Sequence, residues 1–158
     1  DVAERLGRAL LLVGGVYDAA YHARAVAPRV REAEAIGPGE PIRGAVHIGP
    51  RKREDIYALL GSAAATLMPV HWDEPFGLVA VESLAAGTPV VAFRRGGLAE
   101  IVDERSGALV DPDDVDAFAQ AVTAVIGRDP AVCRARAMEF DLARMVARYE
   151  ELYARVTG

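Results

Sequence analysis

The sequence has little of what several classes of protein need. It contains one cysteine, Cys133, which excludes an internal disulfide framework. No run of apolar residues reaches the roughly 18 that a membrane-spanning helix requires. Lys and Arg number 18 against 23 Asp and Glu, and the net charge of -5 argues against a protein that binds nucleic acid through its phosphates. We therefore expect a protein of the reducing cytoplasm, without a signal peptide and without a nucleic-acid partner.

Residues that bind metal are also sparse. The three histidines, the cysteine and the carboxylates show no spacing that is typical of a zinc site. We therefore expect no metal. His22 and His47 are interpreted as structural residues, and a nucleophilic site built on Cys133 and a distant histidine is disfavoured.

The sequence does contain a regular alternation of short apolar runs and helix-like segments. Five apolar runs predict buried strands, at residues 8–15, 45–49, 64–70, 89–93 and 107–110. Helical composition or spacing occupies residues 18–35, 56–63, 78–86, a short stretch after Gly96-Gly97, 113–126 and the end of the chain from Met145. This order predicts one α/β domain over residues 1–158, with a doubly wound, Rossmann-like parallel sheet and helices on both faces.

The stretch DEPFGLVAVESLAAGTPVVA, residues 73–92, contains the main candidate site. It follows a predicted strand, at the edge where parallel sheets bind ligands. The backbone N–H groups near residues 77–79 would be the unpaired donors that begin the next helix, and such donors bind phosphate. Gly77 would let the backbone approach the ligand closely. Glu74 and Glu82 would flank the phosphate and accept hydrogen bonds from hydroxyl groups, so the layout suits a nucleotide sugar.

These residues resemble the retaining glycosyltransferases of family 4, also called glycosyl transferases group 1, which have the two-domain GT-B architecture. The family's E-x7-E motif corresponds to EPFGLVAVE, and its E-A-x-A-x-G-x-P-V-V-A continuation corresponds to ESLAAGTPVVA. The following G-G-x-x-E and T-G-x-L-V-x-P-x-D segments are similar to GGLAEIV and SGALVDPDD. The resemblance covers nearly the whole chain and is to the C-terminal, donor-binding half of the fold.

The resemblance implies transfer of a glycosyl group from a nucleotide diphosphate sugar, with retention at the anomeric carbon and without a metal or a cofactor. Glu74 would be the catalytic residue, binding hydroxyls of the transferred sugar, and Glu82 would bind the ribose. The backbone of four residues would bind the sugar and the diphosphate: Phe76, Gly77, Leu78 and Val79. The loop that holds the base would contribute Pro50, Arg51 and Arg53.

Two parts of the family pattern are missing from this sequence. The family's C-terminal domain opens with a strand, a loop whose Arg and Lys grip the diphosphate, and a helix, all before the strand matched by residues 8–15. The single lysine, Lys52, lies in another loop. The N-terminal, acceptor-binding domain is also absent. We therefore expect a part of a larger enzyme, inactive alone, whose partners are that domain and an acceptor, which could be a sugar, a lipid or a small molecule. A lipid acceptor would place the enzyme at the inner face of the membrane.

Other interpretations of these motifs stay open. A nucleotide-sugar-binding module without transfer activity would keep the same residues. A nucleotide-sugar epimerase of the GT-B fold is a second alternative, although E-x7-E with EPFG fits it poorly. Glu100 could contact the ligand or brace the Gly96-Gly97 turn. His71 and Trp72 could line the cleft, and Trp72 could equally be a packing residue.

Overall fold

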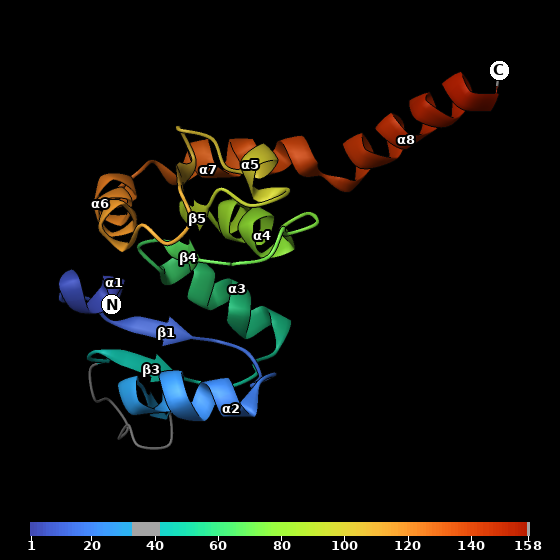
Figure 1. The fold of residues 1–158 in the computed structure, drawn as a ribbon. Helices are drawn as coiled ribbons and strands as arrows, with labels where there is room; N and C mark the ends of the chain where they lie inside the picture. Colours follow the sequence, from blue (N-terminus) through green and yellow to red (C-terminus); the bar gives the residue numbers. More distant parts are fainter. Residues whose placement is uncertain (33–41, 158) are drawn as a thin grey trace. The chain divides into compact units, whose positions relative to one another are not determined.

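The structure is a computed structural model that describes residues 1–32 and 42–157 (Figure 1). It contains two compact units, Asp1–Ile56 and Tyr57–Gly158, called unit 1 and unit 2. Helix α3, Arg53–Ser62, begins in unit 1 and ends in unit 2. Each unit has its own sheet.

Unit 1 contains a three-stranded parallel sheet. Its strands are β1 (Leu10–Leu12), β2 (Arg31–Glu32) and β3 (Ala45–His47), in the order β1-β3-β2. The central β3 pairs its buried Val46 with Leu11 on one side and Arg31 on the other. Within residues 1–32, the helical segments are α1 (Val2–Arg5), α2 (Ala19–Tyr21), a π-helical turn (His22–Val26) and a 3-10 turn (Ala27–Arg29).

The helix predicted over residues 18–35 is wrong in its second half. Asp18 does cap the start, because its carboxylate accepts a hydrogen bond of 2.8 Å from the N–H of Tyr21. Pro28 has no N–H and cannot continue a regular helix, so the helical turns end at the next residue. Val30 is then extended, with φ -123° and ψ 152°, and the chain enters β2. The last three residues of the prediction lie outside the described residues.

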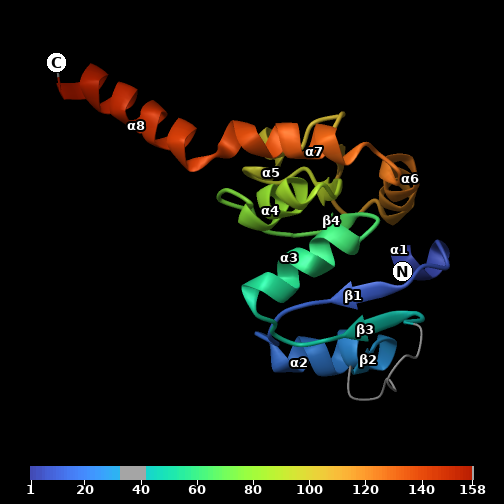
Figure 2. The ribbon, with the colours of Figure 1, turned by 180° about the vertical axis from the view of Figure 1, so that it is seen from behind.

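Unit 2 contains a second three-stranded parallel sheet, in the order β4-β5-β6. The strands are β4 (Thr66–Met68), β5 (Val90–Phe93) and β6 (Gly107–Val110). The helices are α4 (Leu78–Ala86), α5 (Leu98–Ile101), α6 (Val115–Val125), α7 (Pro130–Ala137) and α8 (Leu142–Thr157), with a 3-10 turn at Met138–Phe140. Helices α4 and α7 lie side by side in both views (Figures 1 and 2).

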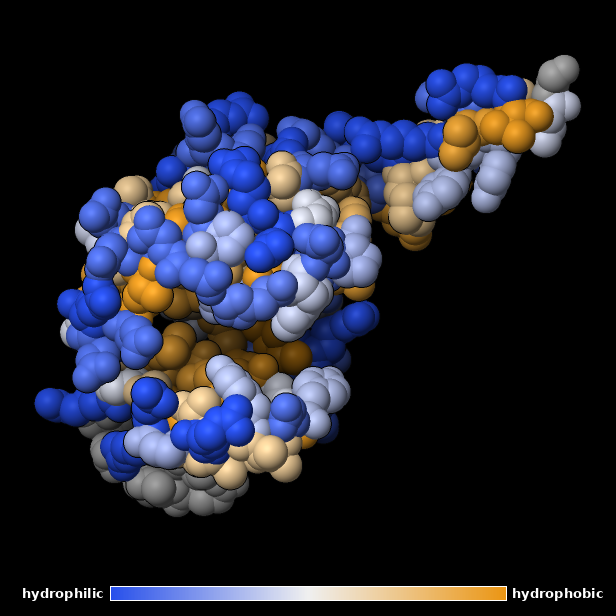
Figure 3. Space-filling model, viewed as in Figure 1, coloured by the Kyte–Doolittle hydropathy of each residue, from blue (hydrophilic) through white to orange (hydrophobic). Residues whose placement is uncertain are grey.

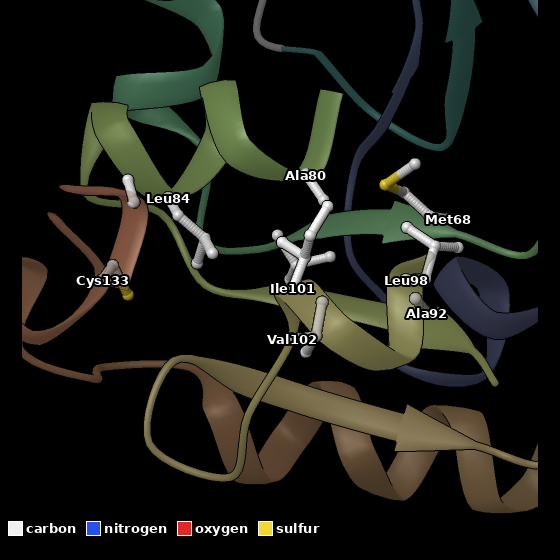
Figure 4. Close-up of a cluster of buried hydrophobic side chains, with 10 residues drawn as sticks. Met68, Ala80, Leu84, Ala92, Leu98, Ile101, Val102 and Cys133 are labelled. Atoms are coloured by element: carbon white, nitrogen blue, oxygen red, sulfur yellow. The ribbon is translucent and has the colours of Figure 1, made fainter. Parts of the chain in front are cut away.

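Strand β5 shows why an uninterrupted apolar run occupies the centre of a sheet. All four of its residues are buried, because strands lie along both edges and side chains cover both faces. Its Ala92 belongs to a cluster of buried apolar side chains from β4, α4, α5 and α7 (Figure 4). Other members are Met68, Ala80, Leu84, Leu98, Ile101 and Cys133. The short helix α5 is therefore anchored in the core by both of its ends.

The five predicted strands are confirmed; four are shorter than their apolar runs, and β6 has the predicted bounds. The predicted helices around α4, α6 and α8 are also present. Helix α7 has no strong apolar stripe, since only Cys133 and Ala137 are buried. Its capping residues are nevertheless recognisable in the sequence: Asp129 accepts a hydrogen bond from the N–H of Ala131 at 2.8 Å, and Pro130 occupies the first turn.

Helix α8 presents its apolar residues on its surface. Leu142, Met145, Tyr149, Leu152 and Val156 follow helical spacing and are between 42% and 75% exposed. Figure 3 shows apolar residues grouped along this helix. Among the described residues, no helix combines the length and the apolar character needed to cross a membrane.

Candidate functional site

The loop between β4 and α4 holds Glu74 in place from two sides. The Glu74 carboxylate accepts a hydrogen bond of 2.9 Å from the indole N–H of Trp72, and its backbone carbonyl accepts one of 2.7 Å from the N–H of Gly97. The side chain of Trp72 is 61% exposed; of the two roles left open by the sequence, lining the cleft or packing, this exposure and the bond to Glu74 favour the first. Glu74 itself is half-buried. Its position is therefore fixed by one residue of its own loop, Trp72, and by one of the neighbouring loop, Gly97.

The turn at Gly96 and Gly97 packs directly against the backbone of the Glu74 loop. A Cβ on Gly96 would lie 2.6 Å from the backbone nitrogen of Glu74 and would also clash with its carbonyl oxygen. A Cβ on Gly97 would lie 2.8 Å from the carbonyl oxygen of Phe76. No side chain fits at either position, so the two loops can approach this closely only through glycine.

Gly77 ends the same loop in a left-handed conformation, with φ 101° and ψ 51°. It is buried, and a Cβ there would lie 2.9 Å from Cδ2 of Leu98 and 3.3 Å from Cδ1 of Ile101. The sequence suggests glycine here for close approach to a ligand. The structure adds a second requirement, because the residue also faces the core of unit 2.

The first turn of α4 offers free backbone donors. Ala80 and Val81 donate to the carbonyl of Gly77, at 2.9 Å and 3.3 Å. The N–H groups of Gly77 and the next two residues, Leu78 and Val79, donate to no acceptor among residues 1–32 and 42–157, and no side chain caps the helix. Leu78 and Val79 are 66% and 48% exposed. An anion could therefore reach these amides at the positive end of the helix dipole.

Glu82 lies one turn further along α4, where its carboxylate accepts a hydrogen bond of 3.2 Å from the hydroxyl of Tyr57. Phe76 is 43% exposed, and its ring meets that of Phe140 edge-on at 6.2 Å. Tyr57 and Phe140 are both absent from the sequence-based site. They lie 25 and 64 positions from their partners, so no local pattern indicates either contact.

Two other residues from the sequence-based site, His71 and Glu100, are more exposed than Glu74. His71 lies 3.4 Å from the carboxylate of Asp113, and its ring packs edge-on against Phe93. The side chain of Glu100 makes no hydrogen bond or ion pair with another described residue. The backbone N–H of Glu100 donates to the carbonyl of Gly97 at 3.0 Å. Glu100 therefore supports the Gly96-Gly97 turn through its main chain and not through its carboxylate.

The predicted base-binding residues belong to unit 1. Arg51 donates to the carbonyl of Pro50 at 2.9 Å and is exposed. Arg53 is the exposed first residue of α3. The structure thus brings Glu74, Glu82 and the residues between them together in unit 2.

Unit 1 also contains a cavity of about 340 Å³ at the carboxyl ends of its strands. Its lining includes the loop of residues 13–18 and the imidazoles of His22 and His47. The two rings are 5.4 Å apart, and Nε2 of His47 lies 2.9 Å from the carbonyl oxygen of Gly14. The structural role predicted for His47 is consistent with this contact.

Comparison with known families identifies the chain. Residues 40–137 match the model of a family described as glycosyl transferases group 1. The chain belongs to this family. It is 41% identical over 97 residues to a glycogen synthase of Mycobacterium tuberculosis (strain CDC 1551 / Oshkosh), which covers 61% of the chain and 23% of the synthase.

Solved structures show the same fold. AviGT4, a glycosyltransferase involved in avilamycin A biosynthesis, superposes with a TM-score of 0.71 at 28% identity, covering 98% of this chain and 45% of that one. Anabaena Alr3699/HepE in complex with UDP-glucose superposes with a TM-score of 0.68 at 24% identity, covering 92% and 40%. The predicted Rossmann-like α/β fold, as in one half of a GT-B glycosyltransferase, is confirmed. The chain spans less than half the length of these relatives.

Proposed function

We propose that the chain is the donor-binding part of a retaining, metal-independent family 4 glycosyltransferase, and that it binds a nucleotide diphosphate sugar. The observation that supports this most directly is the arrangement around α4. Unpaired amides at residues 77–79 lie between two carboxylates, Glu74 and Glu82, in one loop and helix. Amides suit a diphosphate, and the carboxylates suit the hydroxyls of a sugar and a ribose.

The chemistry follows from where charge develops during transfer. As the glycosyl bond breaks, negative charge accumulates on the departing diphosphate. The amides at the start of α4 and the helix dipole would stabilise that charge without having to rearrange. Glu74, held by Trp72 and Gly97, would bind hydroxyls of the transferred sugar. The acceptor, whether sugar, lipid or small molecule, would be bound by another domain of the enzyme.

A binding titration tests this function. We expect UDP, ADP or GDP to bind the chain with a dissociation constant between about 1 μM and 1 mM, the range of typical enzyme substrates. The corresponding nucleosides should bind more weakly, because they lack the diphosphate. Isothermal titration calorimetry of each nucleotide and nucleoside measures both. If none of the three diphosphates binds to the folded chain, the proposed function is wrong. The same result would remove the alternative of a binding module without transfer activity.

The two glutamates are expected to act on different parts of the donor. Glu82→Ala should weaken binding of the nucleoside diphosphate and of its glucose ester alike, by about tenfold, since hydrogen bonds to a charged group contribute roughly 1.5–3 kcal/mol. Glu74→Ala should weaken binding of the glucose ester alone. Titration of both ligands into both variants measures the difference. Equal losses of nucleoside diphosphate affinity in the two variants would contradict this division.

Tyr57 is expected to support Glu82. Tyr57→Phe removes the hydroxyl that donates to the Glu82 carboxylate at 3.2 Å. Nucleoside diphosphate affinity should fall by about threefold, because one hydrogen bond contributes roughly 0.5–1.5 kcal/mol. Tyr149→Phe, on the exposed surface of α8, is the matched control and should bind as the wild type does. A Tyr57→Phe variant with unchanged affinity would show that Glu82 is oriented without this contact.

A further inference from the structure

Arg95 differs from the other half-buried arginines of unit 2. Within residues 57–157, three arginines are half-buried: Arg95, Arg128 and Arg136. Arg128 donates to the carbonyl of Glu104, and Arg136 donates to the carbonyl of Ile101. The side chain of Arg95 forms no hydrogen bond or ion pair with a described residue, and its Nε is enclosed without a partner.

An unpaired guanidinium in such a place is energetically unfavourable. The group carries five N–H donors, and it keeps its charge at any pH at which proteins are folded. Burial removes water from the Nε–H donor, and a buried donor without an acceptor destabilises the folded chain. Buried polar groups are nearly always satisfied, so an exception of this kind points to a partner from outside the chain. For a guanidinium that partner is an anion.

The backbone places Arg95 beside the candidate site. It follows the carboxyl end of β5, and its N–H donates to the carbonyl of Phe93 at 2.8 Å. The next residue, Gly96, lies against the backbone of Glu74. Arg95 therefore belongs to the loop that packs on the Glu74 loop, at the edge of the sheet where ligands bind. Neither Glu74 nor Asp73 pairs with it among the described residues.

We propose that Arg95 donates hydrogen bonds to the diphosphate of the nucleotide sugar. This inference rests on the proposed function of the same site. The single lysine of the chain, Lys52, lies in unit 1, so unit 2 has no lysine to balance the charge of the phosphates. The planar guanidinium binds two phosphate oxygens at once, which an ammonium group does not. Arg95 would add this positive charge to the neutral amides at the start of α4.

The test compares two adjacent arginines by calorimetric titration of the 158-residue chain. Arg95→Gln removes the charge, Arg95→Lys keeps it without the planar fork, and Arg94→Gln is the control at an exposed neighbour. The probes are UDP, ADP and GDP with their nucleosides. For the diphosphate that binds, Arg95→Gln should lower affinity at least tenfold and Arg95→Lys about threefold. Arg94→Gln should change it less than twofold, and nucleoside affinity should stay constant in all three variants.

Each outcome distinguishes the two proposals. Unchanged diphosphate affinity in both Arg95 variants would overturn the role of Arg95 and leave the proposed function intact. Equal losses for diphosphate and nucleoside would show that Arg95 only supports the structure, which also overturns the proposal. A wild-type chain that binds none of the diphosphates would overturn both. If Arg95→Gln does not fold, Arg95→Lys decides the matter through the same ratio of affinities.

Discussion

Gly77→Ala is expected to lower the stability of unit 2 sharply, whereas Gly127→Ala should lower it only slightly. Both glycines have positive φ, 101° and 83°, which strains any residue with a Cβ. A Cβ on Gly77 would press on Leu98 at 2.9 Å and Ile101 at 3.3 Å, whereas one on Gly127 meets nothing within 4 Å. Leu98 and Ile101 are 0% and 1% exposed, so neither can move aside into solvent. The comparison thus separates overpacking from backbone strain.

The expected difference is large enough to measure by urea unfolding. Backbone strain alone should cost Gly127→Ala about 1 kcal/mol. Strain and overpacking together should cost Gly77→Ala about 3 kcal/mol. The single tryptophan, Trp72, lies in the loop before Gly77, and its fluorescence reports unfolding of unit 2. Equal losses in the two variants would show that Leu98 and Ile101 rearrange at little cost.

The same packing affects how ligand affinities of Gly77 variants are interpreted. A bulkier residue there, such as valine, would disturb the core before it obstructed a phosphate. Affinity has to be measured on the fraction that is folded, with the nucleoside and its diphosphate compared in the same variant. A loss of affinity for the diphosphate alone would then support an anion site at the start of α4. A loss of affinity for both the diphosphate and the nucleoside would indicate a distorted loop.

The parts of the site that the sequence predicts are those built from one continuous segment. The apolar run of β4, the turn at residues 73–77 and the helix that begins at Leu78 lie next to each other in the chain. Their order and spacing are therefore visible as a pattern. The same applies to the strands, because burial on both faces requires short apolar runs.

The contacts that the sequence does not predict join residues far apart in the chain. Trp72 orients Glu74 locally, but Gly97 holds its backbone from 23 positions away, and Tyr57 reaches Glu82 from 25. Such pairs depend on how the elements pack, which one sequence alone does not reveal. The error after Asp18 has a different cause. Helical composition continues past Pro28, and the missing N–H there outweighs it.

Arg136→Met is expected to destabilise unit 2 and to loosen the Glu74 loop. Arg136 lies on α7, is 18% exposed and donates to the carbonyl of Ile101 at 2.9 Å. It also donates to the carbonyl of Glu100 and to the carboxylate of Glu139. The two bonds to the carbonyls of Ile101 and Glu100 join α7 to the end of α5. The start of α5 follows Gly97, whose N–H holds the carbonyl of Glu74.

The loss of these bonds should be large. Hydrogen bonds from a charged donor contribute roughly 1.5–3 kcal/mol each, and the carbonyls of Ile101 and Glu100 would both lose this donor, so we expect about 3 kcal/mol in urea unfolding. Arg136→Lys should recover part of the loss. The control is Arg134→Met, an exposed arginine on the same helix, which should cost less than about 0.5 kcal/mol. If Arg134→Met and Arg136→Met have equal effects, α7 does not hold α5 in this way.

The effect of Arg136→Met should also depend on pH, because Arg136 lies 3.9 Å from the carboxylate of Asp103. Burial raises the pKa of Asp103, but hydrogen bonds from Ser106 and the charges of Arg136 and Arg105 outweigh it and bring the pKa below its usual value. A carboxylate whose pKa is lower in the folded state than in the unfolded state stabilises the folded state at pH values above its unfolded pKa. This contribution is lost as the pH falls through the folded pKa. The difference in stability between wild type and Arg136→Met should therefore be greatest near pH 7 and shrink on acidification. A difference that stays constant down to acid pH would mean that Arg136 acts through the carbonyls of α5 alone.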